Sequence, residues 1–379
     1  MKTVFFFAMV VATIVYLLVR ARARPSRAYQ TVDAVVPAFN EEPSIERTLI
    51  SLLRNRYVKR VICVNDGSTD GTADVVAALM TKTPRLILIN QQNTGKGGAL
   101  MHGLKHVTSD YVFLTDADTQ VHPGGDDLGY LIEALDRGAD AVGGIPSTNL
   151  DNARGPLPFI RAAVKVPMII VQRTFQQVVG GGPFVISGAC GMFRTEVLAK
   201  VGFSDRTKVE DLDLTWSLVA AGYKIRQVNK CIVYTEEASG LGDEVRRWRR
   251  WIAGYGVCMR LHRKLIFSRY GLFTIIPMFL LAGIGMGMYA YFWTRALTAH
   301  GVGILPSLAF PLSWVAVIGI IGMVSAVHHR RPWLMLMAPL ALLHVFLAYA
   351  LWVKHGVPGI FTGREPSRDK PTRFANVVA

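Results

Sequence analysis

The chain has 379 residues, 51% of which are hydrophobic, and carries a formal net charge of +15. This length allows one large domain plus a membrane region, and the positive mean hydropathy excludes an ordinary soluble enzyme. The Arg and Lys residues gather beside apolar segments, as the inside-positive bias and anionic headgroups favour. A nucleic-acid-binding protein is therefore not expected.

An apolar run over residues 4–19 comes first and is followed by the basic segment RARARPSR. A signal peptide is one interpretation of a short apolar stretch near Lys2. We favour a retained anchor, because no small-residue cleavage site follows and the Arg cluster stands where an anchor has its cytoplasmic flank. We therefore expect a transmembrane anchor over residues 1–27 and a cytoplasmic domain over residues 28–240.

From residue 31 onwards, short apolar runs alternate with segments of helical periodicity. Strands are predicted over residues 31–37, 60–65, 85–90, 111–116 and 139–144, and helices over residues 42–53, 73–80 and 97–106. Such alternation of Val/Ile/Leu-rich strands with helices indicates a mostly parallel sheet covered on both faces, the Rossmann-like α/β class. Residues 147–187 contain scattered Pro and Gly and allow no clear assignment.

Polar residues follow the first two predicted strands. Pro37, Asn40 and Glu41 lie in the segment PAFNEE, and Asp66 lies in NDGSTDG. Asn, Asp, Gly and Ser all favour turns, so a simple turn is an alternative for the second segment. Two neighbouring polar strand ends are nevertheless the usual place for a nucleotide in an open sheet.

A Gly-rich segment, NTGKGGAL, spans Asn93–Leu100 at the start of a predicted helix. It lacks the spacing of a P-loop. One interpretation is a Gly-rich turn with a solvated lysine. We favour contact with an anionic diphosphate or a nucleobase, because glycines let the backbone approach a ligand and Lys96 supplies a point charge.

Asp116 and Asp118 follow the fourth predicted strand, in the segment LTDADT. We expect the strand to continue through both residues, so that their side chains point the same way past Ala117. Carboxylates in this arrangement repel each other unless a cation or hydrogen-bond donors relieve them. A divalent cation shared with phosphate oxygens is the expected solution, since Mg²⁺ and Mn²⁺ prefer oxygen ligands.

Three carboxylates, Glu210, Asp211 and Asp213, stand together before the predicted helix LTWSLVAAGYKI. The helix dipole favours acidic residues at a helix N-terminus, which is one explanation. We favour a second, in which one of these carboxylates is a general base for a hydroxyl nucleophile.

The segment RRWRRW, residues 246–251, begins the last soluble stretch of the chain. Helical spacing places five apolar residues on one face and the arginines mostly elsewhere: Trp248, Trp251, Ile252, Tyr255 and Met259. A basic face opposite tryptophans is typical of a helix that lies on a membrane, so residues 241–268 are predicted as an amphipathic interface helix region. We also expect some Arg or Trp side chains to reach the active site.

Three further apolar runs, over residues 272–293, 303–327 and 333–353, are each near the length needed to cross a bilayer. They predict three transmembrane helices within residues 269–355, followed by a basic tail over residues 356–379. A simple count of spans places this tail outside the cell, whereas its Arg and Lys residues favour the cytoplasmic side.

These motifs, in this order, resemble the inverting, processive glycosyltransferases of family 2, such as cellulose, chitin, hyaluronan and poly-N-acetylglucosamine synthases. The family pattern has an aspartate in a D-G-S-x-D turn, a D-x-D, a T-E-D and a Q/R-x-x-R-W. Here these are NDGSTD, DAD, VED and RWRRW. Three residues depart from the most frequent pattern: Asn65, Val209 and Arg247. Arginine at the last position also occurs in enzymes that glycosylate a lipid once.

The resemblance implies a GT-A-type domain and a role for each matching residue. Asp66 and Lys96 would contact the uridine end of a UDP-sugar, Asp118 would hold Mg²⁺ or Mn²⁺ on the diphosphate, and Asp211 would deprotonate the acceptor hydroxyl. The complete implied donor site is Pro37, Asn40, Glu41, Asp66, Lys96, Asp116, Asp118, Arg247, Arg250 and Trp251. The implied acceptor site is Ser187, Gly188, Glu210 and Trp251.

The sequence therefore predicts a multi-pass enzyme of the inner membrane with a cytoplasmic catalytic domain. It would add sugars from a UDP-sugar to a growing β-linked polysaccharide and export the product. Single transfer to a ceramide, diacylglycerol or polyprenyl-phosphate acceptor is the alternative. Expected partners are membrane lipids and either a second copy of the chain or an accessory export subunit. A nucleotide-binding transporter is less favoured, because the apolar runs lack acidic residues.

Overall fold

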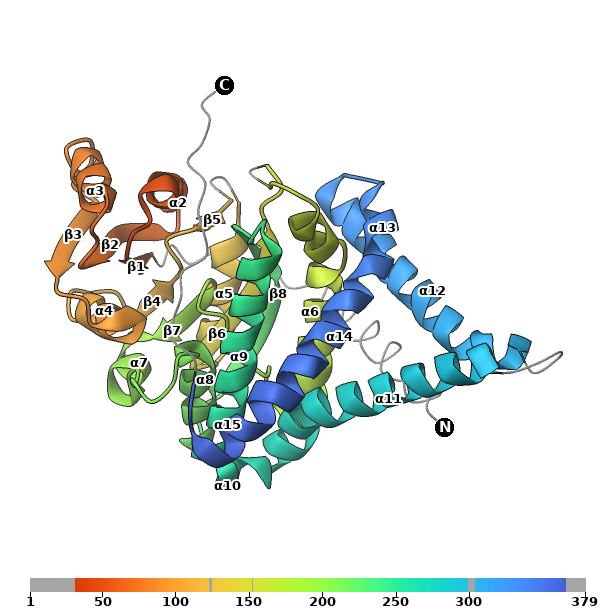
Figure 1. The fold of residues 1–379 in the computed structure, drawn as a ribbon. Helices are drawn as coiled ribbons and strands as arrows, with labels where there is room; N and C mark the ends of the chain where they lie inside the picture. The colour runs from red at the N-terminus through yellow and green to blue at the C-terminus, as the bar shows by residue number, and fades with distance from the viewer. Residues whose placement is uncertain (1–30, 123–124, 152, 299–303, 366–379) are drawn as a thin grey trace.

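The computed structural model describes residues 31–122, 125–151, 153–298 and 304–365. A sheet domain with helices on its faces occupies one side of the molecule, and long helices extend from the other side (Figure 1). The predicted anchor over residues 1–27 lies outside the described residues.

The first half of the domain is the predicted α/β alternation. Its elements are β1 (Val32–Ala38), α2 (Glu42–Arg54), β2 (Val58–Asp66), α3 (Thr72–Met80), β3 (Leu86–Gln91), α4 (Gly95–Leu104) and β4 (Tyr111–Leu114). The strands β3, β2, β1 and β4 pair in this order and are all parallel. The predicted strands and helices of this half are thus confirmed, with ends that differ by a few residues.

The second half adds two antiparallel strands to the sheet, which stays mostly parallel as predicted, because six of its eight strands run in one direction. It comprises β5 (Thr119–Val121), α5 (Asp127–Asp136), β6 (Ala141–Thr148), α6 (Leu157–Gly180), β7 (Gly191–Arg194), α7 (Thr195–Val201), α8 (Glu210–Ala220), β8 (Ile225–Thr235) and α9 (Leu241–Leu261). The order β3-β2-β1-β4-β7-β6-β8-β5 places β7 antiparallel between β4 and β6. At the sheet edge, β5 is antiparallel to β8.

Hydrophobic cores cover both faces of the sheet, as predicted. Alternate residues of β1 point to opposite faces, so Val32, Ala34 and Val36 belong to one core cluster and Val35 to the other. The helical periodicity of α2 buries Ile45, Leu49 and Leu52 completely against the first cluster. These two covered faces leave the strand ends as the place where polar side chains gather.

The C-terminal region consists of helices. They are α10 (Arg263–Ile266), η1 (Gly271–Ile275), α11 (Ile276–Thr298), α12 (Ile304–His329), α13 (Leu334–Met337), η3 (Ala338–Ala341), α14 (Leu342–Leu351), η4 (Trp352–Gly356) and α15 (Val357–Thr362). In Figure 1, α11 leads away from the sheet domain, α12 returns towards it, and the chain then descends from α13 through α14 to α15, which lie beside α9. Among the described residues, two stretches are long and apolar enough to cross a membrane by length and composition, Leu312–His329 and Leu334–Thr362.

The chain returns to the sheet domain after its last apolar helix. A Cβ atom on Gly256 would lie 2.0 Å from the carbonyl oxygen of Gly356, so only glycine permits this contact between α9 and the end of η4. Beyond α15, the Glu365 carboxylate accepts hydrogen bonds from the Thr207 hydroxyl and from the Lys208 amide, the latter at 2.6 Å. The tail therefore begins beside the sheet domain.

Candidate active site

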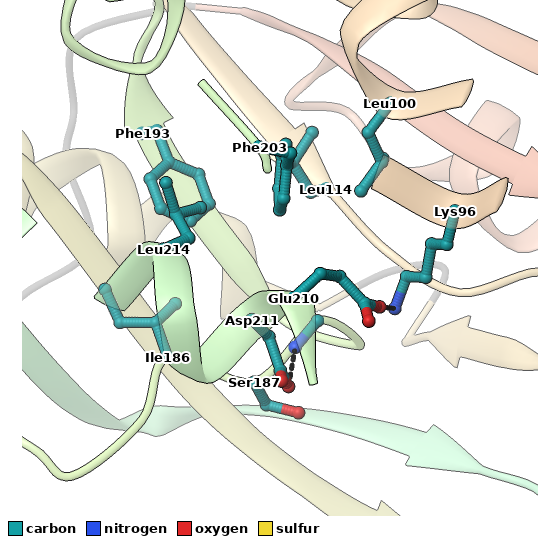
Figure 2. A pocket seen from close by; sticks show the side chains of 11 residues that line it. Lys96, Leu100, Leu114, Ile186, Ser187, Phe193, Phe203, Glu210, Asp211 and Leu214 are labelled. Atoms are coloured by element: carbon teal, nitrogen blue, oxygen red, sulfur yellow. Dashed lines mark hydrogen bonds and ion pairs between the residues drawn. The ribbon is translucent and has the colours of Figure 1, made fainter. Parts of the chain in front are cut away.

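A pocket lies where the start of α4, the end of β4, β7 and the start of α8 meet (Figure 2). Its lining residues are Lys96, Leu100, Leu114, Ile186, Ser187, Gly188, Phe193, Phe203, Glu210, Asp211 and Leu214. Five of the predicted site residues thus come together here, namely Lys96, Ser187, Gly188, Glu210 and Asp211, beside an apolar wall that the sequence did not predict.

Lys96 connects three of the sequence motifs at this pocket. Its Nζ lies 2.6 Å from Asp116 Oδ1 and 3.1 Å from Glu210 Oε1. A Cβ atom on Gly188 would lie 2.6 Å from the same nitrogen, so the glycine leaves room for the lysine side chain. The DAD segment, the VED segment and the segment of Ser187 and Gly188 therefore meet around the ammonium group of the Gly-rich segment.

Asp211 occupies the first turn of α8, with its carboxylate at the pocket (Figure 2). Asp211 Oδ1 accepts a hydrogen bond from the Leu212 amide at 2.9 Å, and Oδ2 accepts one from the Gly188 amide at 3.1 Å. Burial and the neighbouring Glu210 charge raise the pKa of Asp211, and the Lys96 charge opposes them. A carboxylate with a raised pKa beside a pocket is suited to accept a proton.

The third carboxylate, Asp213, has a different environment. It is buried on the far side of the turn and accepts hydrogen bonds from Ser204 and from Arg206, and its Oδ1 lies 2.6 Å from His262 Nε2. Burial alone would raise the pKa of Asp213, but these hydrogen bonds hold it below its ordinary value. Asp213 therefore anchors α8 to its surroundings, while Glu210 and Asp211 face the pocket.

The DAD segment lies in a turn, which corrects the prediction that the strand continues through it. β4 ends at Leu114, and the Thr119 amide donates to the Asp116 carbonyl to close the turn. Asp116 is thereby directed to Lys96. Asp118 lies near the end of β8, where its carbonyl accepts from the Glu236 amide at 3.4 Å. The two carboxylates thus have different neighbours.

Asp118 fits a divalent cation by its donor chemistry. It presents a partly exposed carboxylate, the oxygen ligand that Mg²⁺ and Mn²⁺ prefer. Over the described residues, no group of three or more His, Cys, Asp or Glu side chains is arranged to hold a metal. A cation bound here would therefore take most of its ligands from substrate phosphates and water, as Mg²⁺ sites commonly do.

The predicted donor residues that come first in the chain lie at the carboxyl ends of β1 and β2. Asp66 is buried at the end of β2 and accepts from the Thr94 amide at 2.8 Å and from the Gly95 amide at 2.9 Å. It thereby holds the loop that starts α4, the helix of Lys96. Asn40 accepts from the Thr69 amide at 2.7 Å. The remaining two, Pro37 and Glu41, lie at the end of β1 and just before α2, and Glu41 accepts from Ser44.

The predicted residues of α9 lie outside the pocket lining. Arg250 donates to the Lys208 carbonyl at 3.0 Å and so contacts the loop before α8. Arg247 pairs instead with two buried carboxylates, Glu237 and Glu244, which the sequence analysis did not single out. The Trp251 ring lies beside the Arg247 guanidinium.

The apolar face of α9 packs against the chain itself. Ile252 is 4% exposed, and Trp251, Tyr255 and Met259 pack on the core cluster that contains Phe184 and Trp216. Burial and the nearby Asp211 charge raise the pKa of Tyr255, so its hydroxyl stays protonated close to the pocket. The helix is confirmed over 241–261, and its place at a membrane surface stays a prediction.

Comparisons with known proteins agree with this geometry. Residues 33–202 match the family model described as Glycosyl transferase family 2. The chain is 55% identical over 379 residues to the uncharacterized glycosyltransferase YaiP of Escherichia coli, a match that covers all of this chain and 95% of that protein. It is 31% identical over 228 residues to the poly-beta-1,6-N-acetyl-D-glucosamine synthase of Staphylococcus aureus. That second match covers 59% of this chain and only 54% of the synthase.

A solved structure shares the fold. The mannosyltransferase PcManGT from Pyrobaculum calidifontis, in complex with GDP-Man and Mn²⁺, has a TM-score of 0.57 at 19% sequence identity. The similarity covers 91% of this chain and 96% of that one. Together with the ordered motifs and the near full-length relative, these matches show that the chain belongs to glycosyl transferase family 2.

Proposed function

We propose that this protein is a membrane-embedded, inverting glycosyltransferase that transfers a sugar from a UDP-sugar to the end of a growing β-linked polysaccharide. The observation that carries the proposal is the meeting of Lys96, Asp116, Glu210 and Asp211 at one pocket. This arrangement places the Lys96 ammonium, which can offset charge on a leaving diphosphate, near the Asp211 carboxylate, whose pKa is raised. The aspartate is thus the group best placed to accept a proton.

The proposed reaction is a single direct displacement. Asp211 accepts the proton of the acceptor hydroxyl as its oxygen attacks the anomeric carbon of the donor sugar. The new carbon–oxygen bond forms while the bond from that carbon to the diphosphate breaks on the opposite side, so the configuration inverts. UDP leaves with the bonding electron pair, and the Lys96 ammonium offsets part of the charge that develops on it.

Asp118 would hold Mg²⁺ or Mn²⁺ in this scheme. Such a cation, when bound, offsets negative charge on the donor diphosphate. The similar mannosyltransferase was solved with Mn²⁺ and a nucleotide sugar, which supports the choice of cofactor. Asp66, Asn40 and the other residues at these strand ends would line the nucleotide side of the site, next to the two loops that Asp66 and Asn40 hold in place.

A saccharide is the acceptor that we favour. Ser187 and Gly188 line the pocket beside Asp211, and Trp251 offers a partly exposed indole ring on the adjacent helix, a surface on which a sugar ring can stack. The similarity to a poly-N-acetylglucosamine synthase supports a polymer product. The enzyme would work at the inner membrane with its sheet domain in the cytoplasm, in contact with membrane lipids.

Export of a polymer would require more protein than one copy of the described helices. Only 22% of each candidate span, Leu312–His329 and Leu334–Thr362, is buried inside the chain. A second copy of the chain or an accessory export subunit would supply the remaining helices around a polymer channel across the membrane. The same observation favours our second candidate function, a single transfer to a lipid acceptor, which requires only an active site at the membrane surface.

The test is a product analysis with purified enzyme in proteoliposomes. We would supply a panel of UDP-sugars, with GDP-mannose as a competing donor class, and measure nucleotide release and product length. Long chains from one UDP-sugar, absent with Asp211→Asn, are the expected result. One sugar per lipid would select the second candidate, and no nucleotide release from any donor would contradict both.

A further inference from the structure

Glu244 is a fully buried carboxylate outside the pocket. It lies in the first turn of α9, has 0% exposure, and accepts hydrogen bonds from side chains of three helices. Its donors are Arg161 Nη1 from α6 at 2.9 Å, Trp248 Nε1 from α9 at 2.7 Å, and Arg247 Nη2 from α9. His344 Nε2 from α14 lies 3.3 Å away. One buried carboxylate thus connects the catalytic domain to an apolar helix.

The partners of Glu244 are also the side chains that surround the Trp251 ring. The Arg161 and Arg247 guanidinium carbons lie 5.7 and 5.3 Å from the ring centroid, within the range of cation–π contacts. Trp248 meets the ring edge-to-face at a centroid distance of 5.9 Å. All three of these neighbours donate to Glu244. Glu244 therefore binds each of these three neighbours of the ring.

A second carboxylate completes the charge balance. Glu237 lies 2.7 Å from Arg247 Nη1, 3.3 Å from Arg161 Nε and 2.5 Å from Lys165 Nζ. Three largely buried cations thus face two buried carboxylates. Burial alone would raise the pKa of Glu244, but hydrogen bonds from His344 and Trp248 and the charge of Arg161 hold it below its ordinary value. Glu244 is therefore ionised at neutral pH, as the cations require.

We propose that Glu244 is a positioning residue that fixes the Trp251 ring through Arg161, Arg247 and Trp248. The ring is thereby held in one orientation. Because Glu244 also contacts His344, this orientation depends on the position of α14. The inference accounts for Arg247 at a position where the family pattern often has glutamine, because a carboxylate one turn earlier balances the arginine. The claim that the Trp251 ring binds the acceptor rests on the proposed function. The claim that Glu244 positions the ring does not.

A spectroscopic experiment tests the positioning without any transferase activity. The full chain, labelled with 5-fluorotryptophan, gives fluorine resonances that Trp248→Phe and Trp251→Phe assign. Glu244→Gln keeps the size of the side chain and removes its charge, so we expect displaced or broadened signals for Trp248 and Trp251 only. Asp243→Asn is the matched control, since Asp243 is the adjacent carboxylate and pairs with Arg246. An unchanged Trp251 signal in Glu244→Gln would overturn the proposal.

Kinetics then separate positioning from a general loss of structure. With Glu244→Gln we expect kcat/KM for the acceptor to fall by about 10²-fold, the scale of a small misplacement at a reacting site, while donor affinity by calorimetry is unchanged. Trp251→Ala should show the same split. Equal losses of donor and acceptor affinity would contradict the assignment. If the native enzyme shows no acceptor-dependent turnover, the proposed function fails, and the fluorine signals still decide the positioning.

A double variant covers the case in which Glu244→Gln does not fold. Glu244→Gln with Arg247→Gln leaves two cations and one carboxylate, the same excess of one cation as in the native network. We expect this variant to recover the native thermal midpoint and to keep a displaced Trp251 signal, because two of the supports of the ring are absent. A native Trp251 signal in this variant would also overturn the proposal.

Discussion

The Lys96 ammonium lies 2.6 Å from a carboxylate oxygen of Asp116, in the turn that follows β4. This ion pair joins the Gly-rich segment to the DAD segment across the mouth of the pocket. It also gives Asp116 a role of its own, distinct from that of Asp118, which lies two residues further along the same turn. A donor diphosphate would meet a cation whose position two carboxylates already define, so little reorganisation would accompany its binding.

Removal of the Lys96 charge should weaken catalysis strongly. With Lys96→Met, we expect kcat/KM for the donor to fall by about 10²–10³-fold, the range for loss of one group that stabilises developing charge. The matched control is Lys105→Met, because Lys105 is an exposed lysine that follows the same helix. Initial rates over a series of donor concentrations measure both. Equal rates for the two variants would contradict the role of Lys96.

The general base gives a second prediction. Asp211→Asn keeps the hydrogen-bonding shape but accepts no proton, so kcat should fall by about 10²–10⁴-fold with donor affinity retained. Because the pKa of Asp211 is raised, native activity should be present above this pKa and disappear as the pH falls through it, at a pH above the usual range of aspartate. A pH–rate profile measures the effect. An acid limb at the ordinary aspartate pKa of 3.8 would contradict the assignment.

Asp213 should matter for stability and not for chemistry. Asp213→Asn removes a charge that pairs with Arg206 and contacts His262, and we expect a loss of about 1–3 kcal/mol in the free energy of unfolding. Since the folded-state pKa of Asp213 is lowered, its contribution is complete above the unfolded pKa and decreases as the pH falls towards the folded one. Thermal unfolding from pH 7 downwards measures this. A kcat loss as large as that of Asp211→Asn, at unchanged stability, would reverse the two roles.

Metal removal tests the assignment of Asp118. Excess chelator should abolish the activity of the native enzyme, and added Mg²⁺ or Mn²⁺ should restore it. Asp118→Asn should lose most turnover in the presence of either ion, and its thermal midpoint should stay native, since Asp118 lies in a turn and is partly exposed. Full native activity in the presence of excess chelator would exclude a required cation.

The contact of Glu365 with the loop before α8 gives a fifth prediction. Glu365→Ala removes the acceptor of the Thr207 hydroxyl and of the Lys208 amide, so this loop should open more often. We expect faster tryptic cleavage after Arg206 and Lys208 than in the native protein. Glu196→Ala, in α7, serves as a control for a surface carboxylate elsewhere. Identical cleavage rates would show that the tail contact does not hold the loop.

Local periodicity was sufficient to predict the first half of the sheet domain. Each strand from β1 to β4 is a short run rich in Val, Ile and Leu, and each helix between them carries an apolar face. Neighbouring residues alone therefore indicate the alternation of strands and helices. The order of the acidic motifs likewise predicted that Lys96, Glu210 and Asp211 would share one site. Strand ends of an α/β sheet bring such segments together whatever the details of packing.

The tertiary structure decided what no local pattern contains. β5 and β7 are three and four residues long, too short for periodicity to reveal them, and their antiparallel pairing depends on partners far away in the chain. Asp211 and Asp213 look alike in the sequence, but the turn of α8 sends one to the pocket and the other to Arg206 and His262. Arg247 was predicted beside the donor, yet Glu237 and Glu244 are its partners, because a buried arginine requires carboxylates and only the packing of α6, α9 and α14 brings the network together.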